Sequence, residues 1–301
     1  ALTSADSTHT WDAIAGSITS GSSASFINDD TAFTAGSGIG IGNAFTSADS
    51  MHTWDAIAGC ITTGGTTSFS GDTTAFTAGR DIIIAGLFTS NNSTHTWLAV
   101  AGDLTTGDLS AAWSTILLDA GGNALLGQGI ATETLITLVS GGTLDTSDFT
   151  ALDSQLTFTS GGTATFGILD LNDSDFIVLT TGTGADIFFR LMEAADTQVR
   201  LTSASNIRTL DTKGYIWFRD EDAARDDNII LTAGGDIGSK DRMIILDLPQ
   251  TETLRILQVK NYYLDARVLD NVRLARSIVP TGYGSGRDAL GNWITGEILV
   301  E

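Results

Sequence analysis

The stretch TSADSTHTWDAIAG at residues 3–16 returns as TSADSMHTWDAIAG at residues 46–59. Aligned at this shift of 43 residues, segments 2–44 and 45–87 are identical at 27 of 43 positions, and a weaker third copy occupies residues 88–130. His9, His52 and His95 are therefore one repeat position that is used three times. A fixed period of this length is typical of a solenoid, a propeller or another array of small units.

A shorter period lies inside the long one. An Ala/Ser/Thr-Gly step recurs at intervals of 19 to 23 residues, so each 43-residue repeat consists of two units of about 21 residues. We expect these glycines at corners, where a positive φ or a close backbone approach is needed. The steps end at Gly16, Gly36, Gly59, Gly79, Gly102, Gly121, Gly141, Gly161 and Gly182.

The local pattern selects the architecture. Segments such as 156–159, 176–180 and 228–232 are short, rich in β-branched residues and followed by glycine, which is typical of strands. A propeller blade needs ~40–45 residues, whereas the smaller unit here is itself a repeat, and the leucine-rich pattern is missing. The sequence therefore predicts an all-β fold, a parallel and right-handed β-helix of about 13 coils.

The chain divides by composition. Residues 1–189 carry 19 acidic side chains and one basic one, Arg80, whereas residues 190–301 carry 17 acidic and 14 basic ones. We predict a regular β-helix over 1–189, with double-coil repeats at 2–44, 45–87 and 88–130 followed by single coils. Residues 190–301 are predicted to form irregular coils or a docked terminal β module, with an exposed loop at Asp220–Asp227.

Composition also excludes several functions. The net charge of −21 over 301 residues argues against nucleic acid and other polyanions as partners, because phosphate groups would be repelled. No apolar run approaches the ~18 residues of a membrane span. The single cysteine, Cys60, permits no intrachain disulfide and is expected to be a small buried or turn residue, with an intermolecular disulfide as the alternative.

Part of the chain resembles a known family. The segments 228–239 (NIILTAGGDIGS), 243–248 (MIILDL) and 77–84 (TAGRDIII) are similar to coils of filamentous-haemagglutinin-like exoproteins. Tyr262–Ala266 and Asn271–Leu274 resemble further coils of that kind. The resemblance implies a β-helical region of a secreted bacterial adhesin, a class often exported by a partner outer-membrane protein.

The repeated His-Thr-Trp is the most conspicuous candidate for a site. Successive histidines are two coils apart, ~9.6 Å at the usual strand spacing, whereas a metal needs ligands ~2.0–2.1 Å away. The histidines of one β-helix therefore cannot share an ion, and we interpret them as a stacked structural position. For Trp11, Trp54 and Trp97 we expect core or corner packing, with a surface strip for sugars as the alternative.

Carboxylate clusters are the second candidate. Asp170–Asp175, Asp145–Asp148 and Asn28–Asp30 place several oxygens in short turns, and weak extracellular calcium sites are built from such oxygens. The alternative is solvated acidic turns, and we predict no cofactor. Glycoside hydrolysis needs two placed carboxylates, and spacing does not exclude Asp29/Asp30 or Asp226/Asp227. No pectinase-type motif is present, however, so we predict no enzyme and no catalytic, cofactor-binding or metal-binding residue.

These observations predict a non-catalytic, extracellular or cell-surface protein, a β-helical rod that serves as subunit or segment of a filament, sheath or adhesin stalk. The alternative is a β-helical polysaccharide-binding or polysaccharide-degrading protein. Because the sequence begins at the start of a repeat copy, we expect further coils of a longer chain, or other copies of the protein, to be its partners. Glycans and cell surfaces are the other expected partners, with no nucleic acid and no membrane span.

Overall fold

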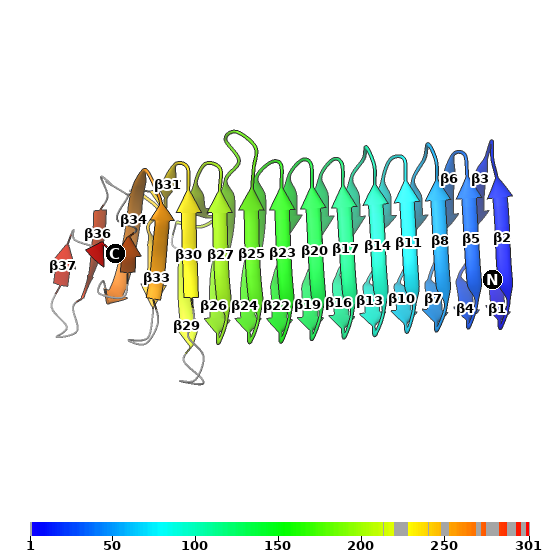
Figure 1. Ribbon diagram of the computed structural model, residues 1–301, viewed down its shortest axis with the longest axis horizontal. Helices are drawn as coiled ribbons and strands as arrows, with labels where there is room; N and C mark the ends of the chain where they lie inside the picture. The colour runs from blue at the N-terminus through cyan, green and yellow to red at the C-terminus, as the bar shows by residue number, and fades with distance from the viewer. Residues whose placement is uncertain are drawn as a thin grey trace. The chain divides into compact units, whose positions relative to one another are not determined.

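A computed structural model describes residues 2–212, 214–219, 228–239, 241–247 and 253–268, with short strands at 272–274, 283–287, 293–295 and 299–300 (Figure 1). All regular elements in these ranges are β-strands, and none forms a helix of the length and apolarity that crossing a bilayer requires. Neighbouring coils pair in parallel, which confirms an all-β solenoid with coils of about 21 residues, although it has about 12 turns rather than 13. Its handedness stays a prediction. The strands at 283–287 and 293–295 pair antiparallel.

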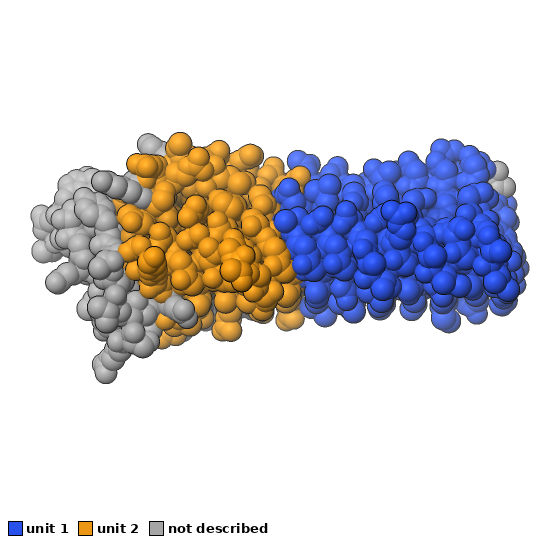
Figure 2. All heavy atoms as spheres, turned by 90° about the horizontal axis from the view of Figure 1, so that it is seen from above, with its two compact units in different colours: residues 1–146 blue, residues 147–301 orange. Residues whose placement is uncertain are grey.

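The chain forms two compact units, residues 1–146 (unit 1) and residues 147–301 (unit 2), which Figure 2 colours separately. Each coil of unit 1 contains three strands, which we assign to a first, a second and a third face in chain order. Unit 1 holds seven such coils, numbered 1 to 7 from the N-terminus. The boundary at residue 189, which was inferred from composition, stays a prediction, and the predicted loop Asp220–Asp227 lies outside the described residues.

The strands of unit 1 follow one plan in every coil. The first face has β1 Leu2–Ala5, β4 Ala24–Ile27, β7 Phe45–Ala48, β10 Thr67–Ser70, β13 Phe88–Asn91, β16 Leu109–Ala112 and β19 Gly129–Thr132. The second has β2 Thr8–Ala13, β5 Asp30–Ala35, β8 Met51–Ala56, β11 Thr73–Ala78, β14 Thr94–Ala99, β17 Thr115–Ala120 and β20 Leu135–Ser140. The third has β3 Ser17–Ser20, β6 Gly38–Ile41, β9 Ile61–Thr63, β12 Ile82–Ile84, β15 Leu104–Thr106, β18 Ala124–Leu126 and β21 Leu144–Thr146.

Unit 2 keeps the plan, but some of its strands are longer and run from the third face of one coil into the first face of the next. These are β24 Ala164–Asn172, β26 Ile187–Ala195 and β34 Asn261–Val268. The others are β22 Phe149–Leu152, β23 Gln155–Ser160, β25 Asp175–Thr180, β27 Gln198–Ser203, β28 Ile207–Thr209, β29 Gly214–Arg219, β30 Asn228–Ala233, β31 Asp236–Ile237, β32 Ile244–Asp247, β33 Thr253–Gln258, β35 Val272–Leu274, β36 Tyr283–Arg287, β37 Trp293–Thr295 and β38 Leu299–Val300.

Alternation along the six-residue strands of the second face fills the interior. In β8, His52, Trp54 and Ala56 are buried, whereas Met51 and Thr53 face outward. The register is exact, since β8 pairs with β5 and β11 at every position. Because successive side chains of a strand point to opposite faces, each inward position forms a row of stacked residues along the solenoid.

The recurrent glycines mark a close approach of neighbouring coils. A Cβ at Gly79 would lie 2.3 Å from the backbone oxygen of Ile57, and one at Gly121 would lie 2.2 Å from that of Val100. Neither glycine has a positive φ. The contact between backbones, rather than an unusual conformation, therefore explains why the Ala/Ser/Thr-Gly step repeats.

The left-handed backbone conformation occurs instead at the corner between the first and second faces. Among the described residues, nine non-glycine residues with φ between 47° and 55° lie there, each in a different coil, and Gly71 takes this place in the fourth coil. Asn and Asp tolerate this conformation better than other non-glycine residues, because their short side chains bond locally. The row contains Asp6, Asn28, Asp49, Asn92, Trp113, Glu133, Asp153, Asp173 and Asp196.

Candidate functional site

The repeated tryptophans form an interior aromatic stack on the second face. Trp11, Phe33, Trp54, Phe76 and Trp97 follow one another from coil 1 to coil 5, with ring centroids 4.4–5.3 Å apart and interplanar angles of 4–12°. Trp54 is 1% exposed and Trp97 is fully buried. Core packing is therefore confirmed for these two residues, and they form no surface strip for sugars.

The repeated histidines lie in the row beside this stack. His52 is fully buried and contacts Ser47 Oγ through Nε2 at 2.6 Å and Thr31 Oγ1 through Nδ1 at 2.6 Å. His95 repeats the arrangement with Ser90 at 2.9 Å and Thr74 at 2.7 Å. We call this Ser–His–Thr unit the polar rung. It confirms that the histidines occupy a stacked structural position.

The polar rung fixes one tautomer of His52. The Ser47 hydroxyl donates its proton to Asp72 Oδ1 at 2.8 Å. Ser47 Oγ must therefore accept from His52 Nε2–H, which leaves Nδ1 to accept from the Thr31 hydroxyl. Burial lowers the pKa of His52 from 6.5 to about 4, although Asp29 opposes the shift, and burial lowers the pKa of His95 to about 3. Both rings are consequently neutral at pH 7.

The polar rung and Asp72 together have the residue types of a hydrolase triad, but their hydrogen bonds connect them differently. In a triad the histidine takes the serine proton and the carboxylate binds the histidine. Here Asp72 binds Ser47 instead, and burial raises the pKa of that carboxyl group. Ser47, His52 and Asp72 are each at most 2% exposed. A substrate has no access to them, so the rung satisfies buried polar groups rather than forming a nucleophile.

The 43-residue period follows from how two coils pack together. In coils 1, 3 and 5 the histidine faces a small Ser on the first face, whereas in coils 2 and 4 a Thr takes the histidine position and a Phe replaces the Ser. Coil 3 thus contributes Ser47 with His52, and coil 4 contributes Phe69 with Thr74. Each large side chain occupies the space beside a small one in the next coil, which is how a close-packed interior is filled.

Many acidic side chains accept hydrogen bonds from the backbone of the next coil. At the corner between the second and third faces, Asp81 Oδ1 accepts from Asp103 N at 2.9 Å, Asp103 Oδ1 from Asn123 N at 2.7 Å, and Asn123 Oδ1 from Thr143 N at 2.9 Å. In unit 2, Asp186 and Asn206 play the same part at 2.8 Å. We call this row the Asx ladder. It gives the acidic composition a structural purpose, since each side chain satisfies a corner N–H group.

The acidic turns considered for calcium do not converge in the described residues. Asp170 faces outward on the first face, Asp173 takes the left-handed corner, and Asp175 begins a strand of the second face. Asp148 accepts from Ile168 N at 2.8 Å, and Asp145 lies on the third face with a pKa that burial raises. Within the described ranges, no group of three or more His, Cys, Asp or Glu could hold a metal ion.

The two carboxylates considered for glycoside hydrolysis do not face the same side of the sheet. Asp29 is 1% exposed and accepts from Ser7 N at 2.7 Å, whereas Asp30 is exposed at the start of β5. Asp226 and Asp227 lie outside the described residues. Cys60 is half-buried in a turn, where its thiol donates to Asp81 Oδ2 at 3.3 Å.

The first face of unit 2 carries a feature that the sequence analysis missed. Three adjacent strands, β22, β24 and β26, line an open groove of about 240 Å³. Asp170 and Glu193 lie on neighbouring strands in this groove, and Glu193 pairs in register with Trp217 of the next strand, β29. Tyr215 and Trp217 are each 42% exposed. The alternation Tyr-Ile-Trp-Phe at 215–218 was the available signal, because it places two aromatic side chains on one face.

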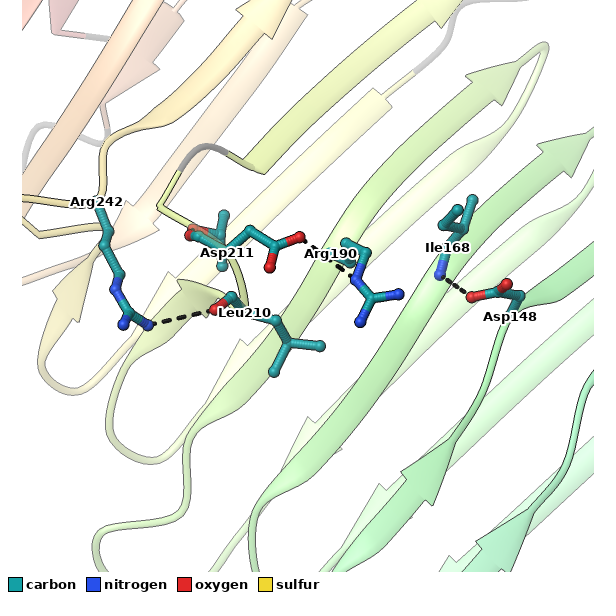
Figure 3. A network of polar contacts seen from close by, with 7 residues as sticks. Asp148, Ile168, Arg190, Leu210, Asp211 and Arg242 are labelled. Carbon is teal, nitrogen blue, oxygen red and sulfur yellow. Dashed lines mark hydrogen bonds and ion pairs between the residues drawn. The ribbon is translucent and has the colours of Figure 1, made fainter.

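Figure 3 shows charged side chains of unit 2 that lie near its first face. Arg190 and Asp211 form an ion pair of 3.4 Å, and Arg242 Nη1 donates to the carbonyl oxygen of Leu210 at 3.4 Å. Both ion-pair partners are more than half exposed, so this pair contributes ~1 kcal/mol at most.

No protein-family model, curated protein or solved structure matches the chain.

Proposed function

We propose that the chain is a non-catalytic structural or adhesive protein of the cell exterior. In this proposal it serves as a segment or subunit of a surface filament, sheath or adhesin stalk. Its partners are further coils of a longer chain or other copies of itself, together with glycans or cell surfaces. The likeness of its coils to those of filamentous-haemagglutinin-like exoproteins belongs to the same proposal.

One observation carries the proposal. The residues that could have served chemistry, the repeated Ser, His and Trp, are buried in coils 3 and 5 and make the same contacts in both. An active site is a single constellation, whereas a stacked polar rung stabilises every coil that contains it. Stacked coils give each unit continuous outer faces, which suits a protein that presents a surface to its partners.

A second candidate function is favoured by a different observation. The groove over β22, β24 and β26 contains the carboxyl groups of Asp170 and Glu193, and the exposed Trp217 lies in register beside Glu193 on the next strand. This combination of carboxyl and aromatic side chains is suited to ligand binding. This supports the alternative of a β-helical polysaccharide-binding protein. Asp170 and Glu193 lie on adjacent strands, so a polysaccharide-degrading protein is its catalytic variant.

The experiment is immunogold labelling of producing cells with antibodies raised against the purified chain. We expect gold on the outside of intact cells, along fibres or a surface layer. Labelling that requires permeabilised cells would contradict the proposal. Electron microscopy of the purified chain, with and without chelator, then separates long filaments from isolated particles and shows whether calcium holds filaments together.

A further inference from the structure

We propose that the first face of unit 2 binds an uncharged, extended glycan. Trp217 and Tyr215 form its stacking platform, and the groove over β22, β24 and β26 supplies its hydrogen bonds. This inference rests on the proposed adhesive function and names the partner class of that function.

The aromatic platform is the first support. In β29 the side chains of Ile216 and Phe218 are buried, whereas those of Tyr215 and Trp217 point outward and are each 42% exposed. Alternate residues of a strand are ~7 Å apart, so the two rings stand side by side on one surface. Aromatic side chains with one apolar surface and one polar group suit boundaries that are partly wet. The C–H face of a sugar ring packs against such a surface.

A row of polar side chains leads away from the platform. Thr150, Asp170 and Glu193 occupy matching positions on β22, β24 and β26, and Trp217 takes the same position on β29. Successive positions in this row are ~4.8 Å apart. Asn172 adds an amide beside Asp170 in the groove. A carboxylate accepts hydrogen bonds through two oxygens, and an amide both accepts and donates, which matches the vicinal hydroxyl groups of a sugar.

The charge of the protein selects an uncharged glycan. The chain carries a net charge of −21, and Asp170 and Glu193 lie in the groove itself. Sulfated or uronic-acid polymers would be repelled by this field. A neutral polymer avoids the repulsion and still uses the carboxylates as hydrogen-bond acceptors.

The geometry of the polar row favours an extended polymer. Thr150, Asp170, Glu193 and Trp217 follow one another across four strands, ~14 Å from the first to the last at the usual strand spacing. A linear chain running along the row of polar groups can contact all of this surface.

The test uses the whole chain and named sugars. Isothermal titration and tryptophan fluorescence would measure binding of cellohexaose, N-acetylchitohexaose, mannohexaose and maltohexaose. We expect at least one hexasaccharide to bind, and Trp217→Ala or Tyr215→Ala to weaken its binding by about tenfold or more. Trp113→Ala is the matched control, because Trp113 is 57% exposed but belongs to unit 1. It should leave binding unchanged, and the thermal unfolding midpoints of all three variants should match that of the parent.

Several outcomes would overturn the inference. They are the absence of binding by all four sugars, an equal loss in the Trp113→Ala variant, and a preference for hexalysine that Trp217→Ala abolishes. The last outcome would make the site one for cationic peptides. Cleavage of a bound hexasaccharide would instead support the glycan site and contradict the proposed non-catalytic function, so the two failures are distinguishable.

Discussion

Coils 1–5 and coils 6–7 of unit 1 share the three-strand plan but fill their interiors differently. In coils 1–5 the second face contributes alternating His/Trp and Thr/Phe pairs. In coils 6 and 7 the same two positions hold Ile116 with Leu118 and Ile136 with Leu138. The repeat shortens at the same point, from 43 residues to about 20.

This difference explains the structural origin of the 43-residue period. The length of a coil is set by its three strands and corners, and it hardly changes between the two regions. The 43-residue period instead records a two-layer interior, in which a histidine coil and a threonine coil supply complementary volumes and complementary hydrogen bonds. Aliphatic side chains of similar size in every coil need no such alternation, and the period then falls to one coil.

The largest effect is expected from emptying the aromatic stack. Trp54→Ala removes an indole that stacks on both Phe33 and Phe76, and we expect the free energy of unfolding to fall by about 3–5 kcal/mol. Leu138→Ala, in the aliphatic region, is the comparison and should cost about 2–5 kcal/mol. Chemical denaturation measures both losses. A loss below about 1 kcal/mol for Trp54→Ala would show that the stacked indole contributes little to stability.

Acid should destabilise the polar-rung region selectively. The pKa of His52 falls from 6.5 to about 4 on folding. The unfolded chain therefore binds more protons between these values, and stability decreases as the pH falls through this window. The pKa difference between the unfolded and folded states corresponds to a loss of roughly 3 kcal/mol in the free energy of unfolding for His52 by the time the pH reaches about 4. Asp72, whose pKa burial raises, offsets part of this loss because it gains its proton more readily in the folded state.

Denaturation curves between pH 7.5 and 4 measure this dependence. The double variant His52→Gln with His95→Gln keeps an amide in each rung but removes the titration, so its curves should change less with pH. If parent and double variant lose stability in parallel, the histidines are not the groups responsible.

The Asx ladder should contribute a smaller amount, because its groups are near the surface. Asp103→Ala leaves the N–H group of Asn123 without its 2.7 Å acceptor, and we expect a loss of about 1 kcal/mol. Asp103→Asn keeps an acceptor oxygen and should be close to neutral. Thermal melts of the two variants check this, and equal losses would show that the charge, rather than the hydrogen bond, is what matters.

The smallest effect is expected at Trp113, which has a φ of 50° and an exposed side chain. A left-handed conformation costs an L-residue about 1–2 kcal/mol, and glycine brings an entropy cost of about 0.5–1 kcal/mol. Trp113→Gly should therefore stabilise the protein by about 0.5 kcal/mol. A careful comparison of denaturation midpoints is sufficient, and a clear destabilisation would mean that the indole makes contacts that stabilise the fold.

Much of the fold was predictable because the sequence repeats. The spacing of Gly79 and its equivalents set the coil length, and the short β-branched segments such as 156–159 and 176–180 indicated strands, which the structure has at β23 and β25. The reason for the glycines was only partly predictable, because a backbone contact such as that of Gly79 with Ile57 involves residues of two coils. The positive φ angles occur at residues such as Asp49 and Asn92, which a glycine count cannot reveal.

The candidate sites were predictable to different degrees. The histidine period indicated a stacked structural position, but it could not identify Ser47 and Thr31 as partners, because these residues lie on other strands. The groove beside Trp217 depends on strands that are separated by about 20 residues in sequence. Such proximity follows only from the stacking register.

The most direct test of the structural role of the repeated histidines is ¹⁵N NMR of the histidine side chains during a pH titration from 7.5 to 4. His52 and His95 should show a neutral Nε2–H tautomer at pH 7 and should not begin to protonate until the pH approaches 4. Titration of both near their ordinary pKa of 6.5 in the folded protein would show that these rings are accessible to water, and would contradict the buried polar rung.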